Sequence, residues 1–239
     1  MGLQIATNVG ALNAYRNLSV NQNDVSKSLE KLSSGLRINR AADDAAGLAI
    51  SEGLRSQVNG LNVAARNAQD GISVIQTAEG ALTEVHSILQ RVRDLAVQAG
   101  SDSNNADSRT AIKTEIDSLG KELTRVAAST NFNGIKLLDS ASTLTFQVGA
   151  GSDADEDQIA VTLTDFSGLG ARIEALTVTD AAAALTTIAA LDTEIKGVST
   201  ARAGLGAVQN RFESTINSLQ VSAENLAAAK SRIADTDMA

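Results

Sequence analysis

The chain of 239 residues contains no cysteine, no proline and no tryptophan, and aromatic residues make up only 2% of it. The lack of cysteine excludes disulfides and thiol chemistry. The lack of proline removes the commonest helix breaker, so we expect an α-rich chain. Because aromatic rings are so few, the core must be built from Ala, Leu, Ile and Val, and small residues allow helices to pack closely.

Charge and hydropathy exclude two classes of partner. The net charge is −8 and no basic stripe is available to neutralise phosphates, so we expect no nucleic acid. No run approaches the roughly 18 apolar residues of a membrane span, so we expect no membrane partner. The first residues, Met1 to Thr7, lack the basic start and apolar core of a cleavable signal peptide.

Few residues could carry chemistry. His86 is the only histidine, which rules out a two-histidine metal motif, and we expect it to be packed or to lie at an interface. Residues 153–157 hint at a calcium loop, but Gln158 and Thr164 replace the required glycine and glutamate, which favours a solvated acidic turn. The pair Asp43-Asp44 opens a helix, where carboxylates cap backbone amides. We predict no enzymatic activity, no catalytic residue, no metal site and no cofactor.

The chain is instead rich in heptad patterns. Residues 43–99 predict one nearly unbroken helix, about 85 Å long at 1.5 Å per residue. Its apolar residues recur four and three positions apart: Leu54, Val58, Leu61, Ala65, Ala68, Ile72, Ile75, then after a step Ala78, Leu82, Val85, Leu89, Val92, Ala96 and Ala99. Such a seam packs a helix against partner helices along its length, and the step predicts different neighbours along its two halves.

The remaining segments complete a mainly α fold. Residues 107–128 predict a second, antiparallel helix, and residues 179–237 predict a third with a similar seam, the natural partner of 43–99. Between them, residues 131–178 form a β-hairpin region, because apolar and polar residues alternate over 144–148 and 159–163. The predicted fold is therefore a set of long antiparallel helices, packed as a coiled-coil-like bundle, with a small β-hairpin region. We divide it into residues 1–42, a helix and link, and a helical core domain of residues 43–239.

The N-terminal helix is weakly apolar. Over residues 3–33 an apolar stripe is set among Asn, Gln and Ser, and most helical stability comes from tertiary packing. We therefore expect this segment to be disordered in the monomer, or ordered only against a partner. The stripe, our candidate assembly surface, consists of Ile5, Val9, Leu12, Leu18, Val25, Leu29 and Leu32.

One surface of the long helix has two interpretations. In residues 89–98 the seam leaves Gln90, Arg91, Asp94 and Leu95 facing elsewhere, and Leu95 is then expected to be exposed. Leu95 is either an ordinary surface leucine or, together with Arg91, part of a surface that a partner protein binds. Glu115, on the outer face of the second helix, is expected nearby.

Several long motifs, in this order, resemble the bacterial flagellin family: Leu29 to Asn39, Ala41 to Ile50, Asn67 to Ser73, Gln76 to Leu82, Asn131 to Gly134, Ala223 to Leu226 and Ser231 to Asp237. The agreement covers about residues 1–150 and 195–239. The resemblance implies a structural subunit that self-assembles into the flagellar filament for motility. It also implies secretion through the flagellar export machinery to the extracellular filament, and terminal segments that are disordered in the monomer. The alternative is a hook-filament junction protein or a non-polymerising flagellin paralogue.

The resemblance also implies a host partner, the toll-like flagellin receptor of animal innate immunity. Arg91, Leu95 and Gln98 match the family's recognition segment, with Glu115 on the adjacent helix, while Asp94 replaces the usual glutamate. Gln90 belongs to the same segment. The candidate recognition surface is therefore Gln90, Arg91, Asp94, Leu95, Gln98 and Glu115.

The chain departs from the family pattern at its end. Flagellins continue beyond a motif like that of residues 233–237 and supply a second helix to the inner tube, whereas this sequence stops at Ala239. Either the chain is truncated or its filament is built differently. The family's export chaperone binds that tail, so the resemblance does not extend to this partner.

Overall fold

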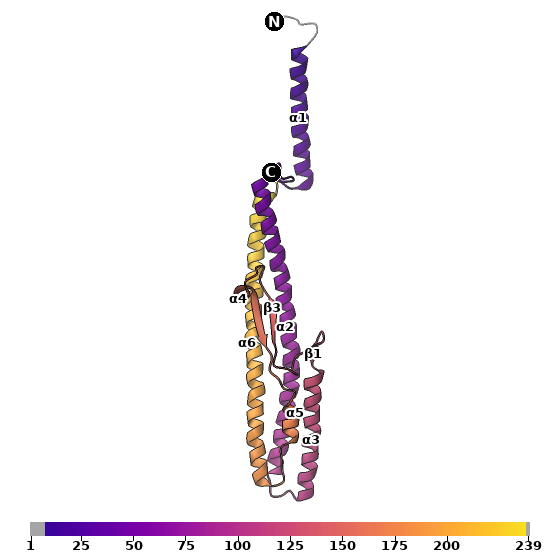
Figure 1. The fold of residues 1–239 in the computed structure, drawn as a ribbon, viewed down its shortest axis with the longest axis vertical. Helices are drawn as coiled ribbons and strands as arrows, with labels where there is room; N and C mark the ends of the chain where they lie inside the picture. Colours follow the sequence, from indigo (N-terminus) through magenta and orange to yellow (C-terminus); the bar gives the residue numbers. More distant parts are fainter. Residues whose placement is uncertain (1–7, 238–239) are drawn as a thin grey trace. The chain divides into compact units, whose positions relative to one another are not determined.

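The computed structural model describes residues 8–237, and the chain divides into two compact units, Val63–Gln220 and the pair of segments Met1–Asn62 and Val221–Ala239. The elements in chain order are α1 (Val9–Ser34), α2 (Ala45–Ala99), α3 (Ala106–Ser129), β1 (Asn131–Phe132), β2 (Ile135–Lys136), β3 (Thr143–Gln147), α4 (Ala154–Asp157), β4 (Gln158–Thr162), α5 (Leu169–Glu174) and α6 (Ala181–Ala234) (Figure 1). The predicted mainly α fold with a small β region is confirmed, and the three core helices begin and end within three residues of the predicted positions. The division at residue 42 stays a prediction.

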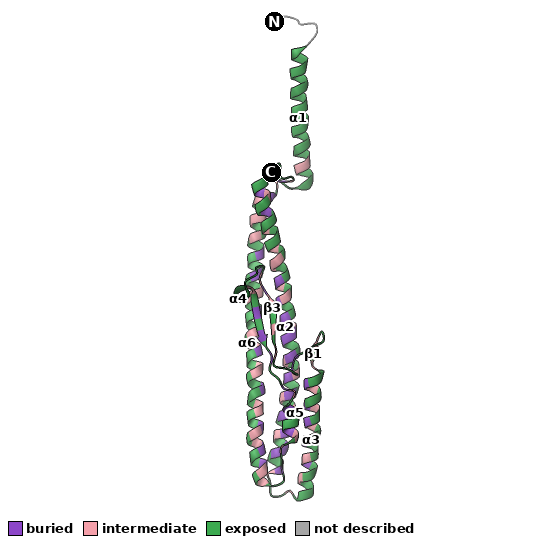
Figure 2. Cartoon of the chain, in the orientation of Figure 1, coloured by how far each residue is buried: buried purple, intermediate pink, exposed green. Residues whose placement is uncertain are grey.

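In the unit Val63–Gln220, α2 and α6 run antiparallel. Arg93 pairs with Asp192, and Glu79 pairs with Arg202, so residues later in α2 meet residues earlier in α6. The heptad positions face inward in both helices (Figure 2). On α2 the buried seam residues are Ala68, Ile72, Ile75, Ala78, Leu82, Val85, Leu89, Val92, Ala96 and Ala99; on α6 they are Leu191, Val198, Leu205 and Phe212.

The short helix α5, which the sequence analysis did not predict, packs closely on α3. Gly120 and Gly170 lie where the two helices cross, and a Cβ added at Gly170 would stand 2.3 Å from the Gly120 carbonyl oxygen. Any larger residue at either position would push the helices apart. The leucine and isoleucine of α5, Leu169 and Ile173, are buried in the core.

The predicted hairpin is present. Strands β3 and β4 pair antiparallel, with Leu144 opposite Val161 and Phe146 opposite Ile159. In β4 Ile159 and Val161 are buried and the residues between and beside them are exposed, which is the alternation expected of a sheet covered on one face. The ring of Phe146 meets that of Phe212 edge to face, with centroids 5.6 Å apart. The sheet is thereby fixed on the helices.

A second, two-residue hairpin joins β1 and β2. Its turn residues, Asn133 and Gly134, have φ angles of 49° and 81°. Both values lie in the left-handed region that asparagine and glycine tolerate best, which is why this dipeptide suits a tight hairpin turn.

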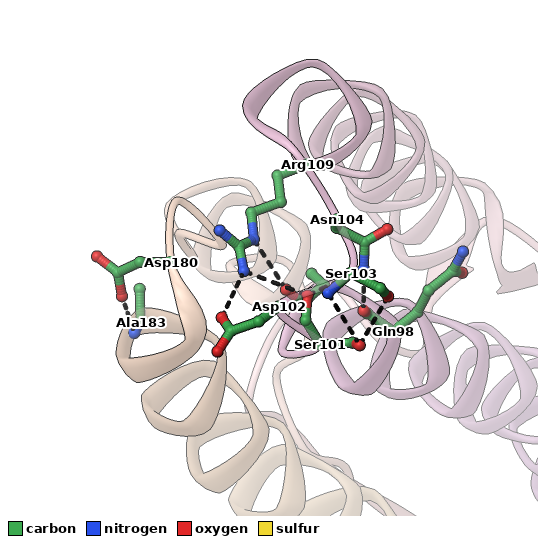
Figure 3. A network of polar contacts seen from close by, with 9 residues as sticks. Gln98, Ser101, Asp102, Ser103, Asn104, Arg109, Asp180 and Ala183 are labelled. Carbon is green, nitrogen blue, oxygen red and sulfur yellow. Dashed lines mark hydrogen bonds and ion pairs between the residues drawn. The ribbon is translucent and has the colours of Figure 1, made fainter.

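The turn between α2 and α3 is held by one partly buried arginine (Figure 3). Arg109 donates from Nε to the Ala99 carbonyl oxygen (3.0 Å) and from Nη2 to the Ser101 carbonyl oxygen (3.3 Å). It also pairs with the Asp102 carboxylate at 3.4 Å. The carbonyl groups at the end of a helix have no intrahelical partner, so Arg109 satisfies groups that α2 itself leaves open.

In the other unit, the link after α1 is tied to the end of α6. Gly35 ends α1 with a φ of 70°, and its carbonyl oxygen accepts a hydrogen bond from the Thr236 N–H at 2.9 Å. The Arg37 N–H donates to the Ala234 carbonyl oxygen at 2.7 Å, and its guanidinium donates to that of Ile233 at 2.6 Å. The link is therefore anchored by residues nearly 200 positions away in the sequence.

Candidate functional site

The candidate assembly surface lies on α1. This helix of 26 residues has no buried residue, and Figure 2 shows it exposed along almost its entire length. Six members of the predicted stripe leave more than half of their surface exposed: Val9, Leu12, Leu18, Val25, Leu29 and Leu32. The seventh, Ile5, lies outside the described residues. Solvent-exposed apolar side chains aligned on one helix are typical of a surface that another protein covers.

Tyr15 belongs to this surface and was missed by the sequence analysis, which considered aliphatic residues only. At 73% exposure it is the most exposed of the stripe's apolar side chains. At 100° per residue it projects midway between Leu12 and Leu18, where the aliphatic pattern has a gap of six residues. It makes the stripe continuous.

Local hydrogen bonds define where α1 begins and ends. The Asn8 side chain accepts from the Ala11 N–H at 3.1 Å and caps the first turn. Near the other end, Glu30 pairs with Arg40 at 2.9 Å. Asp43 accepts from the N–H groups of Arg40 and Asn39, and these bonds hold the pKa of its carboxyl below the ordinary value. The predicted capping role of the Asp43-Asp44 pair is met by Asp44, which accepts from the Gly47 N–H at 2.8 Å.

The candidate recognition surface is partly assembled. Arg91 on α2 donates from Nε and Nη2 to the Glu115 Oε1 on α3, at 3.0 and 2.7 Å. Gln90, Asp94 and Gln98 are exposed on α2, as predicted. The structure therefore brings Arg91 and Glu115 together across two helices and leaves both more than 40% exposed.

The prediction of an exposed Leu95 was wrong. Its side chain is only 2% exposed and lies in the hydrophobic core. Arg91 pairs with α3, whereas Arg93, 200° further round the helix, pairs with Asp192 on α6. Because α2 is covered from both sides, its buried face is wider than one heptad seam and includes Leu95. Leu95 is therefore not accessible to a partner protein while the unit is folded.

The other polar candidates have structural roles. The His86 ring lies half-buried, with Nε2 3.2 Å from the Gln90 amide nitrogen. Asp153 caps the short α4 by accepting from the Asp155 N–H at 2.9 Å. Among residues 8–237, no cluster of His, Asp and Glu has the arrangement of a metal site. Within that same range, no helix combines the length and apolarity needed to cross a membrane.

Sequence comparison identifies the family. A model of the bacterial flagellin N-terminal helical region matches residues 5–143, and a model of the bacterial flagellin C-terminal helical region matches residues 188–239. The chain belongs to the bacterial flagellin family. It is therefore a structural protein of the flagellar filament and not an enzyme.

Relatives with the name flagellin align over nearly the whole chain. The flagellin of Halalkalibacterium halodurans is 51% identical over 233 residues, which are 97% of this chain and 85% of that protein. The flagellin of Bacillus subtilis is 47% identical over 272 aligned residues, covering 99% of this chain and 88% of that protein.

Solved structures agree with this flagellin assignment. The crystal structure of Bacillus cereus flagellin superimposes with a TM-score of 0.57 at 34% identity, covering 69% of this chain and 94% of that chain. A putative flagellar hook-associated protein from Vibrio parahaemolyticus reaches a TM-score of 0.67, covering 81% of this chain and 100% of that chain. Its identity of 13% makes this second likeness one of fold alone.

Proposed function

We propose that this flagellin assembles into the filament through the apolar stripe of α1, which neighbouring copies cover. The observation that carries the proposal is that α1 has no buried residue and yet exposes eight large apolar side chains, seven of which form the stripe, Tyr15 included. Burying a side chain of this size stabilises an assembly by about 1.5–3 kcal/mol. Burial of the whole stripe therefore stabilises the assembly by about 10–20 kcal/mol.

Tyr15 provides a direct assay, because it is the only tyrosine and the chain has no tryptophan. Polymerisation should change its fluorescence as the ring becomes covered, in parallel with filaments seen by electron microscopy. Leu18→Ser and Val25→Ser should each raise the critical concentration about tenfold or more, since one buried aliphatic group is worth about 1.4 kcal/mol or more. Asn23→Ser, about 140° round α1 from Leu18 and about 160° from Val25, is the matched control and should polymerise like the parent. Equal critical concentrations in all three variants would refute the proposal.

The alternative of a junction protein makes a different prediction about abundance. If this chain forms the bulk of the filament, it should be the major protein of sheared filaments and should reach the medium through the export machinery. A junction protein would be present in a few copies per filament. Quantitative mass spectrometry of sheared filaments distinguishes the two, and a minor share would reject the filament proposal.

We propose a second function for the monomer, as a ligand of the host toll-like flagellin receptor. The observation in its favour is the exposed Arg91–Glu115 pair, which presents one cation and one anion on adjoining rigid helices. Arginines of this kind are enriched among the residues that dominate binding energy. The surface comprises Gln90, Arg91, Asp94, Gln98 and Glu115, without the buried Leu95.

A cell reporter assay tests the receptor proposal. Arg91→Ala should lower the potency of the monomer about tenfold or more, because loss of a central charged contact costs about 2 kcal/mol. Arg125→Ala is the control, since Arg125 is a similarly exposed arginine paired with Glu122 on α3. If Arg91→Ala signals as strongly as Arg125→Ala, the surface is not the recognition site.

A further inference from the structure

Strand β4 has one unpaired edge. The Leu163 N–H donates to the Ser142 carbonyl oxygen, and the Val148 N–H donates to that of Asp157. Because antiparallel residues alternate between bonded and non-bonded pairs, this register turns the N–H and C=O groups of Ala160 and Thr162 away from β3. Among the described residues these outward groups have no hydrogen-bond partner. Such an edge is a template for another strand.

A groove lies beside this edge. It has a volume of about 590 Å³ and is bounded by Thr162 and Thr164 on the strand side and by α6 on the other. The α6 wall includes Gly197 and Gly204, and a Cβ added at either glycine would meet no atom within 4 Å. At these two glycines the wall carries no side chain, and a polypeptide backbone can approach it closely there.

The same unit contains a short segment, residues 176–179, that belongs to no helix or strand. Between α5 and α6, Val178 is buried while Thr177 and Thr179 are exposed, which is the alternation of a half-covered strand. The Thr177 carbonyl oxygen accepts from the Thr187 hydroxyl at 2.8 Å. Among the described residues, the N–H groups of residues 177–179 have no acceptor. A cavity of about 330 Å³ is lined by this segment and by residues of α3, so the segment is open to solvent on that side.

We propose that residues 176–179 of one copy pair with the free edge of β4 in a second copy. This inference rests on the proposed function, because it requires copies to meet in an assembly. Adding an extended segment to a sheet edge satisfies the open backbone groups of both partners. The charges also fit, since Lys196 lines the groove and Asp180 follows the segment.

The geometry of this contact suits a polymer. The edge of β4 and the segment 176–179 are different patches of the same chain, so pairing them makes a head-to-tail interface. Such an interface forms an open helical filament when the rotation between copies does not close into a ring, and each end of that filament then keeps one free edge or one free segment. The strand pairing would add to the contacts of α1 and involves only the unit Val63–Gln220.

The absence of cysteine allows a direct crosslinking test. Ala160→Cys and Thr162→Cys are each mixed with Thr177→Cys or Thr179→Cys under polymerising conditions, and a mild oxidant is added. Opposite residues of paired strands have Cα atoms about 4.5–5.5 Å apart, which suits a disulfide. We expect at least one of the four mixtures to give tenfold more dimer than Thr145→Cys, placed on the opposite edge of the hairpin, mixed with the same partners. Equal yields would overturn the inference.

Electron microscopy of the same mixtures separates the two proposals. Filaments without the specific crosslink would overturn the strand pairing and leave the α1 proposal standing. If no filaments form, the monomer still tests the inference, with a synthetic peptide of residues 175–180 as the probe. The peptide should slow hydrogen exchange at the Ala160 and Thr162 amides of the parent chain. No slowing by the peptide would overturn the strand pairing in that case.

A proline variant checks that the slower hydrogen exchange results from binding of the peptide to the free edge of β4. Ala160→Pro removes an N–H that the β3–β4 ladder does not use, so the hairpin should remain folded. Thr145→Pro makes the same change on the opposite edge of the hairpin. We expect Ala160→Pro to abolish the peptide's protection of Thr162 and Thr145→Pro to leave it unchanged. If the peptide slows hydrogen exchange at Thr162 equally in Ala160→Pro and Thr145→Pro, it binds elsewhere and the inference fails.

Discussion

The contact between Gly71 and Phe212 supports a quantitative prediction about how α2 and α6 pack. Phe212 is fully buried on α6, and a Cβ added at Gly71 of α2 would stand 2.8 Å from its Cζ and 3.1 Å from its Cε1. Gly80, nine residues later in α2, has open space around the same position. The two glycines therefore share a helix, but Gly71 is buried against Phe212, whereas Gly80 is exposed and a methyl group there would meet nothing.

Substitution by alanine separates helix propensity from packing. Both Gly71→Ala and Gly80→Ala remove a residue that costs a helix about 1 kcal/mol. Gly80→Ala should therefore raise the free energy of unfolding by about 0.5–1 kcal/mol. Gly71→Ala gains the same propensity but overpacks the core against Phe212, which costs about 1–3 kcal/mol. Its net effect should be neutral to destabilising, and the two variants should differ by about 1–3 kcal/mol.

Urea unfolding of the monomer, followed by far-ultraviolet circular dichroism, measures the difference directly. The urea midpoint of Gly80→Ala should rise, and that of Gly71→Ala should stay the same or fall. The slope m should be unchanged in both variants. Adding Phe212→Leu to each variant should shrink the gap between them, because residues in contact are energetically coupled. If Gly71→Ala stabilises the chain as much as Gly80→Ala, the close approach of the two helices at this point is refuted.

Two further predictions concern charged groups. Arg109→Ala should lower the free energy of unfolding by about 1.5–3 kcal/mol, because it leaves the Ala99 carbonyl without its charged donor. Arg125→Ala on the surface should leave the free energy of unfolding nearly unchanged, and thermal unfolding of both variants checks this. The hydrogen bond from Arg93 holds the pKa of Asp192 below its ordinary value of 3.8. A depressed carboxyl pKa stabilises the fold above the unfolded value, and that stabilisation is lost as the pH falls below 3.8 through the folded value. Asp192→Asn should therefore flatten the acid limb of the stability curve, and an unchanged limb would contradict the assignment.

The sequence predicted the long elements well because their signals are long. A heptad seam repeats over many turns, so the seams of α2 and α6 were recognisable and their positions from Ala68 to Ala99 are buried as expected. The β3–β4 hairpin was found for the same reason, since three apolar residues at alternate positions mark each strand. A helix of six residues such as α5 completes fewer than two turns. It shows no period that distinguishes it from a loop.

Two other features depend on contacts that a local pattern does not contain. The burial of Leu95 follows from the cover that α3 adds to a helix already facing α6, and one seam specifies only one neighbour. The pairing of the link at residues 35–37 with residues 234–236 joins distant parts of the chain through single hydrogen bonds. In both cases the missing information was which other segments of the chain lie against the residue, and the residue types involved do not indicate this.

The number of neighbours also explains how the same aliphatic residues serve two purposes. Leucines of the α6 seam, such as Leu191, are fully buried because α2 supplies a complementary seam within the same chain. Leu18 on α1 has equivalent chemistry, but no described element of the chain covers it. A polar substitution should therefore separate folding from assembly. Leu191→Ser should unfold or strongly destabilise the monomer, whereas Leu18→Ser should leave its urea midpoint unchanged and weaken only polymerisation. If Leu18→Ser shifted the midpoint as much, α1 would be part of the monomer's core and the stripe could not be an assembly surface.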